Sequence, residues 1–131
     1  MNEHPPLMHR AEFEAFVTSL PAARIVRQWR DDSVGYVGDR IFALLDRDPG
    51  EIWLKVSDLA YPILIEQPGI RPAPYFARAK WVAISAASGL DDVELRAYVV
   101  EAHRLGAARL TRKARAALGL EALTPAAPQR P

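Results

Sequence analysis

Short apolar runs separated by turn signals between residues 24 and 56 place the tightest constraint on the fold of this chain. Turn residues at 31–33, 38–39 and 46–50 leave only a few positions between one run and the next. Connections this short join antiparallel neighbours, because a parallel pair of strands needs a much longer crossover. We therefore expect these runs to form a meander of antiparallel strands.

Three helices are expected around this sheet. Apolar residues recur at spacings of three and four from 9 to 20, and Pro21 ends this stripe. A second, short helix is expected over about residues 58–67. A capping-box pattern that starts at Asp91 begins a third helix, expected from about 91 to 117.

The segment 71–85 adds one or two strands, which gives the order helix, three strands, helix, two strands and helix. The apolar face of an antiparallel sheet must be covered, and these helices can cover it. The expected fold is a two-layer α+β domain over residues 9–119, with an antiparallel sheet covered by helices. A flexible arm is expected at 1–8 and a flexible Pro- and Ala-rich tail at 120–131.

The composition excludes several kinds of chemistry. The 131 residues include no cysteine, so disulfides, thiol catalysis, Cys-ligated zinc and iron–sulfur clusters are excluded. No apolar run approaches the roughly 18–20 residues that span a bilayer. The N-terminus lacks the apolar core of a signal peptide. We expect a cytoplasmic protein with no membrane association.

No catalytic or metal-binding motif is present. The sequence contains no HExxH, Walker or GxGxxG pattern, and Asp46 and Asp48 offer fewer oxygens than a calcium loop. His103 borders the apolar stripe of the last helix and is expected to be half-buried and structural. We expect no enzyme, no catalytic residue, no metal and no cofactor. An enzyme with a pocket near His103 or Tyr75 is the alternative.

Charge is unevenly distributed along the chain. The net charge is +1, but residues 1–70 carry 7 Lys or Arg against 11 Asp or Glu, whereas residues 71–131 carry 10 against 5. Such an asymmetry can direct a nearly neutral domain towards an anion. If folding interleaves the two halves, their charges instead cancel.

The segment 71–85 places cations beside aromatic rings and contains no acid. Its basic and aromatic members are Arg71, Tyr75, Phe76, Arg78, Lys80 and Trp81. Phosphates attract such cations and bases stack on such rings, although a half-buried strand has the same composition. In a continuous strand Lys80 and Trp81 point to opposite faces, so the prediction rests more on the cations than on the rings.

A second basic segment lies between residues 103 and 115. Arg109, Arg112 and Lys113 share one helix face at spacings of three and four residues. They are either a solvated face that complements the C-terminal end of the helix dipole or part of a positive surface shared with 71–80.

The three tryptophans fall one to a strand segment. Trp29 and Trp53 are expected to anchor the core, because large rings bury much apolar area. Trp81 follows two cations, so it fits either the core or a surface.

The order of four short motifs resembles one family. The motifs are SLP at 19–21, GDRIFALL at 38–45, IWLKVS at 52–57 and EQPGIRPAPYFARAKWVAI at 66–84. Together they make the chain, from about Phe13 to Leu118, similar to the MmcQ/YjbR family of small bacterial proteins.

This resemblance implies a secretion-chaperone-like fold and a DNA-binding role through a double-wing arrangement of hairpins. Tyr75, Lys80 and Trp81 match the family's aromatic and basic segment. Many relatives have a His- and Asn-rich stretch where this chain has residues 76–79, so only a role that depends on charge carries over.

The first hypothesis is a DNA-binding module of low sequence specificity that needs no cofactor; its oligomeric state is left open, with a monomer favoured over an oligomer. Phosphate contacts are expected from Arg71, Arg78, Lys80, Arg109, Arg112 and Lys113, with Tyr75 and Trp81 beside them. The alternative is a protein-interaction or chaperone-like module with no nucleic-acid role, which predicts an exposed apolar patch or a homodimer.

Overall fold

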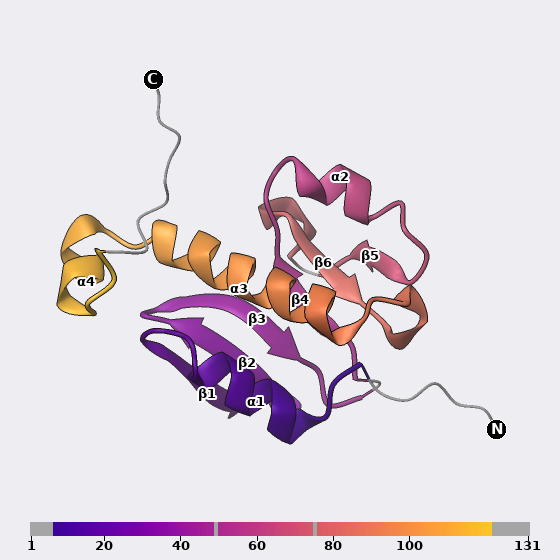
Figure 1. The fold of residues 1–131 in the computed structure, drawn as a ribbon, viewed down its shortest axis with the longest axis horizontal. Helices are drawn as coiled ribbons and strands as arrows, with labels where there is room; N and C mark the ends of the chain where they lie inside the picture. Colours follow the sequence, from indigo (N-terminus) through magenta and orange to yellow (C-terminus); the bar gives the residue numbers. More distant parts are fainter. Residues whose placement is uncertain (1–6, 49, 75, 122–131) are drawn as a thin grey trace.

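Six strands form one antiparallel sheet in the order β1-β2-β3-β4-β6-β5 (Figure 1). The computed structural model describes residues 7–48, 50–74 and 76–121. The strands are β1 (Ala23–Gln28), β2 (Asp32–Val37), β3 (Arg40–Leu45), β4 (Ile52–Lys55), β5 (Ile70–Pro72) and β6 (Trp81–Ile84). The α-helices are α1 (Arg10–Thr18), α2 (Ala60–Leu64), α3 (Asp92–Ala108) and α4 (Arg112–Ala117). Two 3₁₀ turns, η1 (Ala77–Ala79) and η2 (Ala86–Ser88), flank β6.

The α+β class and the antiparallel sheet are confirmed, but the expected element order is wrong. Four strands precede α2 where three were expected, because each apolar run from 23 to 55 forms a strand of its own. The turn between β3 and β4 explains why the apolar runs 41–45 and 52–56 form two strands and not one. The buried Asp46 carboxylate accepts hydrogen bonds from the backbone N–H groups of Gly50 (2.7 Å) and Glu51 (2.9 Å).

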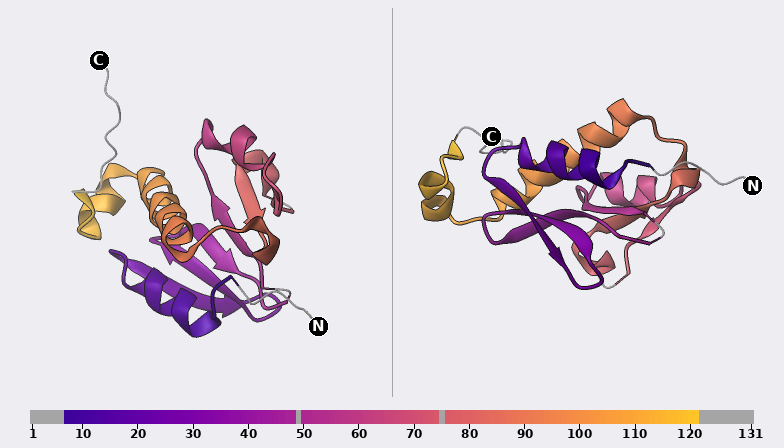
Figure 2. Two further views of the ribbon diagram at one scale, coloured as in Figure 1. Left: turned by 45° about the vertical axis from the view of Figure 1, so that its right-hand side comes forward. Right: turned by 90° about the horizontal axis from the view of Figure 1, so that it is seen from below.

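Helices α1 and α3 cover one face of the sheet; on the other face, called the open face, Ala73 and Phe76 pack over Trp81 and Ala83 of β6. Figure 2 shows α1 and α3 on the same side of the strands. Phe13 and Val17 of α1 and Val99 of α3 are fully buried against the sheet. In β4 the residues Ile52 and Leu54 face this core, so strand alternation turns residues 53 and 55 towards the open face.

The single helix expected over 91–117 is two helices. α3 ends at Ala108, and Thr111 caps a new helix by accepting a hydrogen bond at Oγ1 from the backbone N–H of Ala114 (3.0 Å). The Arg115 guanidinium donates to the carbonyl oxygen of Leu110 (2.6 Å) and to that of Ala108 (3.3 Å), the last residue of α3, whose carbonyl has no partner within the helix.

Trp29 does not anchor the core, contrary to expectation. It lies beyond the last residue of β1 that pairs with β2, in the turn that joins these strands. Its backbone φ is +63°, a conformation that bulky residues rarely adopt, and the residue is 57% exposed. The indole therefore projects from the open face at a cost in backbone energy.

His103 is more deeply buried than expected. It is 2% exposed and contacts the ring of Phe42 edge-on, with 5.2 Å between the ring centroids. Its Nε2 lies 2.8 Å from the carbonyl oxygen of Pro21, which can only accept, so Nε2 carries the proton. Burial lowers the pKa of His103, although the hydrogen bond to Pro21 acts in the opposite direction.

Acidification is expected to destabilise the fold through His103. Its pKa is lower in the folded than in the unfolded chain, so stability present above about pH 6.5 is lost as the pH falls below that value. His103→Gln keeps a donor for the Pro21 carbonyl but does not titrate. Urea unfolding at about pH 7.5 and 5.5 should show a smaller loss of unfolding free energy in the variant than in the native protein. Equal losses would contradict this role.

Two substitutions at Trp29 test whether its backbone is strained. Both Trp29→Gly and Trp29→Ala remove the indole, but only glycine adopts a positive φ without strain. We expect the glycine variant to be the more stable of the two by about 1 kcal/mol in urea unfolding. If alanine is as stable as glycine, the turn relaxes and no strain is stored there.

Candidate functional site

Cations from three elements meet at the end of β4. Lys55 is the last residue of this strand, and its Nζ donates a hydrogen bond to the carbonyl oxygen of Ala79 (2.7 Å). The pKa of Lys55 is lowered, first by burial and then by the positive charges of Arg109 and Lys80, while Asp58 acts in the opposite direction. Lys80 and Arg109 are therefore close enough to Lys55 to repel its charge.

Lys80 and Arg109 reach this point by different local structures. Lys80 ends the 3₁₀ turn η1 with a φ of +65°, and its Nζ lies 5.2 Å from the centroid of the Tyr61 ring. Arg109 caps the C-terminus of α3 and is exposed. The left-handed turn at Lys80 means that the strand alternation expected between Lys80 and Trp81 does not apply.

Three further cations of the expected set lie on η1 and α4. Arg78 is exposed in η1, whereas Arg112 and Lys113 are exposed in the first turn of α4. Figure 1 shows α4 beyond the end of α3 and away from β5 and β6. The expectation that Arg112 and Lys113 share one helix face with Arg109 is wrong, because the helix breaks between them.

The helix dipole does not account for these two cations. Positive side chains stabilise a helix near its C-terminus, but Arg112 and Lys113 stand at the N-terminus of α4. Their position is therefore mildly unfavourable for the helix itself.

The other expected site residues lie elsewhere. Arg71 is ion-paired with Glu51, with 2.7 Å between Nη2 and Oε1. Trp81 is 4% exposed and packs against Phe76, so its ring faces the protein. Tyr75 falls outside the described residues.

The remaining cations of the group have no acidic partner. Within the ranges that the structure describes, no ion pair includes Lys55, Arg78, Lys80, Arg109, Arg112 or Lys113. By contrast, Arg104 of the same basic sequence segment is paired with Glu101. Asp58 still acts on the charge of Lys55, so the positive charge here is partly offset without a direct ion pair. We call Lys55, Lys80 and Arg109 the cationic cluster.

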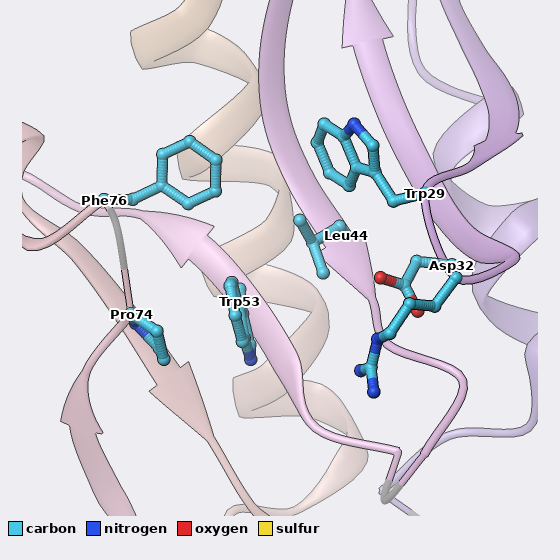
Figure 3. A pocket seen from close by; sticks show the side chains of 7 residues that line it. Trp29, Asp32, Leu44, Trp53, Pro74 and Phe76 are labelled. Carbon is cyan, nitrogen blue, oxygen red and sulfur yellow. The ribbon is translucent and has the colours of Figure 1, made fainter.

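A groove of about 620 Å³ lies on the open face of the sheet. Figure 3 shows Trp29 on one side, Trp53 and Phe76 on the other, and Leu44 between them, with α3 behind the strands. Leu44 is almost fully buried and forms the floor. The lining is thus mostly aromatic and aliphatic, as is usual for pockets that bind organic molecules.

The wall opposite Trp29 is held in place by its neighbours. The rings of Trp53 and Phe76 meet edge-on, with centroids 6.3 Å apart, and Phe76 packs in turn on Trp81 at 5.0 Å. The indole Nε1 of Trp53 donates to Glu51 Oε1 at 3.2 Å.

Arg30 and Asp32 line one end of the groove. The Asp32 carboxylate accepts a hydrogen bond from the backbone N–H of Arg47 (2.9 Å). Arg30, Arg47 and Asp48 line a second hollow of about 460 Å³, which adjoins the groove through Arg30. Across the described ranges, no ion pair involves Arg30 or Arg47.

Sequence reasoning missed Lys55 and the groove, although a signal for part of them existed. The IWLK pattern of β4 alternates, so Trp53 and Lys55 share the face opposite Ile52 and Leu54. Nothing in the sequence placed Trp29 across from Trp53, because that depends on a strained turn.

The described residues offer neither a metal site nor a membrane span. They contain no group of three or more His, Asp or Glu side chains placed to hold a metal ion. None of their helices has the length and apolar character needed to cross a bilayer.

Comparisons with known proteins identify the architecture. The Deinococcus radiodurans protein DR2400, which has a DUF419 domain, matches with a TM-score of 0.78 and 23% identity over 90% of this chain and 93% of that protein. A Pseudomonas syringae protein matches with a TM-score of 0.64 and 22% identity over 76% of this chain and 99% of its own. No curated protein matches the chain.

Identities this low show a shared fold and nothing further. The YjbR family model, however, matches residues 18–105, which is well over half of the sequence. Together with the shared fold, this match shows that the chain belongs to the YjbR family.

Proposed function

We propose that this protein is a nucleic-acid-binding module that contacts the phosphates of DNA through the cationic cluster. The observation that carries the proposal is that Lys55 Nζ donates to the carbonyl oxygen of Ala79 (2.7 Å), the residue before Lys80. The charges of Arg109 and Lys80 add to burial in lowering the pKa of Lys55. Arg78 on η1 and Arg112 and Lys113 on α4 are further exposed cations, which would contact phosphates outside the cluster.

Like charges that repel one another are stabilised when a polyanion binds. Each phosphate contacted by a Lys or Arg also releases condensed counterions, which provides most of the affinity in binding without sequence preference. The Lys and Arg side chains of the cluster are available for such phosphate contacts, because they form no ion pair within the described part of the chain. Phosphate contacts position a protein on DNA but do not read bases, so we propose low sequence specificity.

A protein-interaction module is the second candidate. It is favoured by the apolar groove on the open face and by the exposed side chains of Leu59 (84%) and Ile63 (64%) near α2. A stable homodimer in sedimentation experiments, combined with no DNA binding at low salt, would favour this candidate over the first. Neither proposal involves a catalytic residue, a metal or a cofactor.

The affinity for duplex DNA is expected to fall steeply with salt. If about four phosphates are neutralised, a plot of log K against log salt concentration has a slope near −3.6. Fluorescence anisotropy of a labelled duplex between about 50 and 200 mM salt measures this slope. If neither this duplex nor single-stranded DNA binds at the lowest salt concentration, the proposal is excluded.

Removing two cations of the cluster should lower this slope. Lys80→Gln combined with Arg109→Gln removes up to two phosphate contacts, so the slope should change by about 1.8, towards zero. Arg27→Gln is the single-charge control, because Arg27 lies on β1 and is ion-paired with Glu14. The control should keep the slope of the native protein. If Arg27→Gln changes the slope by as much per charge removed as the double variant does, then binding depends on net charge alone and the cluster has no special role.

A further inference from the structure

We propose that the groove on the open face binds unpaired bases, and that the nucleic acid recognised by this protein is single-stranded. This inference rests on the proposed function, since it names the form of the ligand. Bases would stack on Trp29 and on the opposite wall of Trp53 and Phe76. The flanking phosphates would meet Arg30 and Arg47 at one end and Lys55 at the other.

The conformation of Trp29 is the first argument. An exposed indole on a residue with a φ of +63° stabilises neither the core nor the turn. Strained residues of this kind persist chiefly where a site requires the side chain in that place. A ring displayed to solvent beside a groove offers a flat face to a planar partner.

The dimensions of the groove suit bases on both sides. Trp53 stands on β4 and Trp29 follows β1, so the strands β3 and β2 lie between them. Neighbouring strands are about 4.8 Å apart, so the three spacings from β1 to β4 put the strands that carry the two walls roughly 14 Å from each other. A stacked ring needs about 3.5–4 Å, so a base can stack on each wall above Leu44.

Basic side chains lie at both ends of the groove, although acids accompany them at one end. Arg30 and Arg47 form no ion pair within the described residues, and the hollow that they line with Asp48 shares Arg30 with the groove, whose lining also includes Asp32. Lys55 follows Trp53 by two residues on the same face of β4, about 7 Å along the strand. A strand that crosses the groove would therefore run from these arginines to the cationic cluster.

A duplex and a peptide fit these features less well. The bases of a duplex are stacked on one another and cannot lie flat on protein rings without leaving the helix. A peptide in extended form gains affinity by pairing with the edge of a sheet, whereas this groove lies over the inner strands β2, β3 and β4. Guanidinium groups at the rim also favour an anionic ligand.

Oligo(dT) of about 12 nucleotides is a suitable probe, because it has no stable paired structure and spans a site of this kind. We expect it to quench the intrinsic tryptophan fluorescence of the native protein. Trp29→Gly should weaken oligo(dT) binding by about tenfold, which is the scale of one lost stacking contact. The same variant should leave binding to a matched duplex unchanged within about twofold. Trp29→Phe, which keeps a ring, should restore most of the affinity.

A second variant, at Phe76, controls for the possibility that Trp29→Gly alters binding by changing the backbone of the turn and not by removing the ring. Phe76→Leu keeps an apolar side chain on the opposite wall but removes the ring, and it should also weaken oligo(dT) binding more than duplex binding. Circular dichroism melts of each variant establish that the fold is retained.

The outcomes separate the two proposals. If oligo(dT) and duplex bind equally well and neither groove variant changes either affinity, the groove inference is wrong and the proposed function stands. If neither nucleic acid binds at low salt, both are wrong. If an apolar dye binds to the native protein but not to Trp29→Gly, while oligo(dT) does not bind at all, the groove belongs to an apolar partner and the inference is overturned.

Discussion

One-sided burial of the antiparallel sheet determines where the other features of this protein lie. Helices α1 and α3 cover one face, so where a strand alternates regularly one residue enters the core and the next faces the other way; in β3 a register shift against β2 brings both Phe42 and Ala43 into the core. In β4 this rule sends Ile52 and Leu54 inward and presents Trp53 and Lys55 on the open face. The groove and the cationic cluster both begin from that single strand.

The two candidate binding features depend on interactions that the core does not provide. The groove needs an exposed ring at Trp29, which is held by a backbone conformation that is costly for tryptophan. The cationic cluster needs Lys55, Lys80 and Arg109 to stay close although their charges repel. Both features oppose the stability of the isolated domain, and a bound polyanion would relieve the second directly.

The strand pattern and the turn residues of the sequence are enough to predict the α+β class and the antiparallel sheet, because both depend on local periodicity. Features that depend on single backbone angles could not be predicted. The break after Ala108 separates Arg109 from Arg112, and the left-handed turn at Lys80 changes the direction of its side chain. The ion pair of Arg71 could not be predicted either, because Glu51, which neutralises its charge, lies in a distant part of the sequence.

Alternation along the strands also has an evolutionary consequence. Because the residues that hold the fold together and those that meet a ligand occupy different positions of the same strands, either set can change while the other is kept. The two solved structures keep this architecture at 22–23% identity with this chain. A shared fold therefore does not imply a shared partner, and what the open face of each protein contacts has to be established separately.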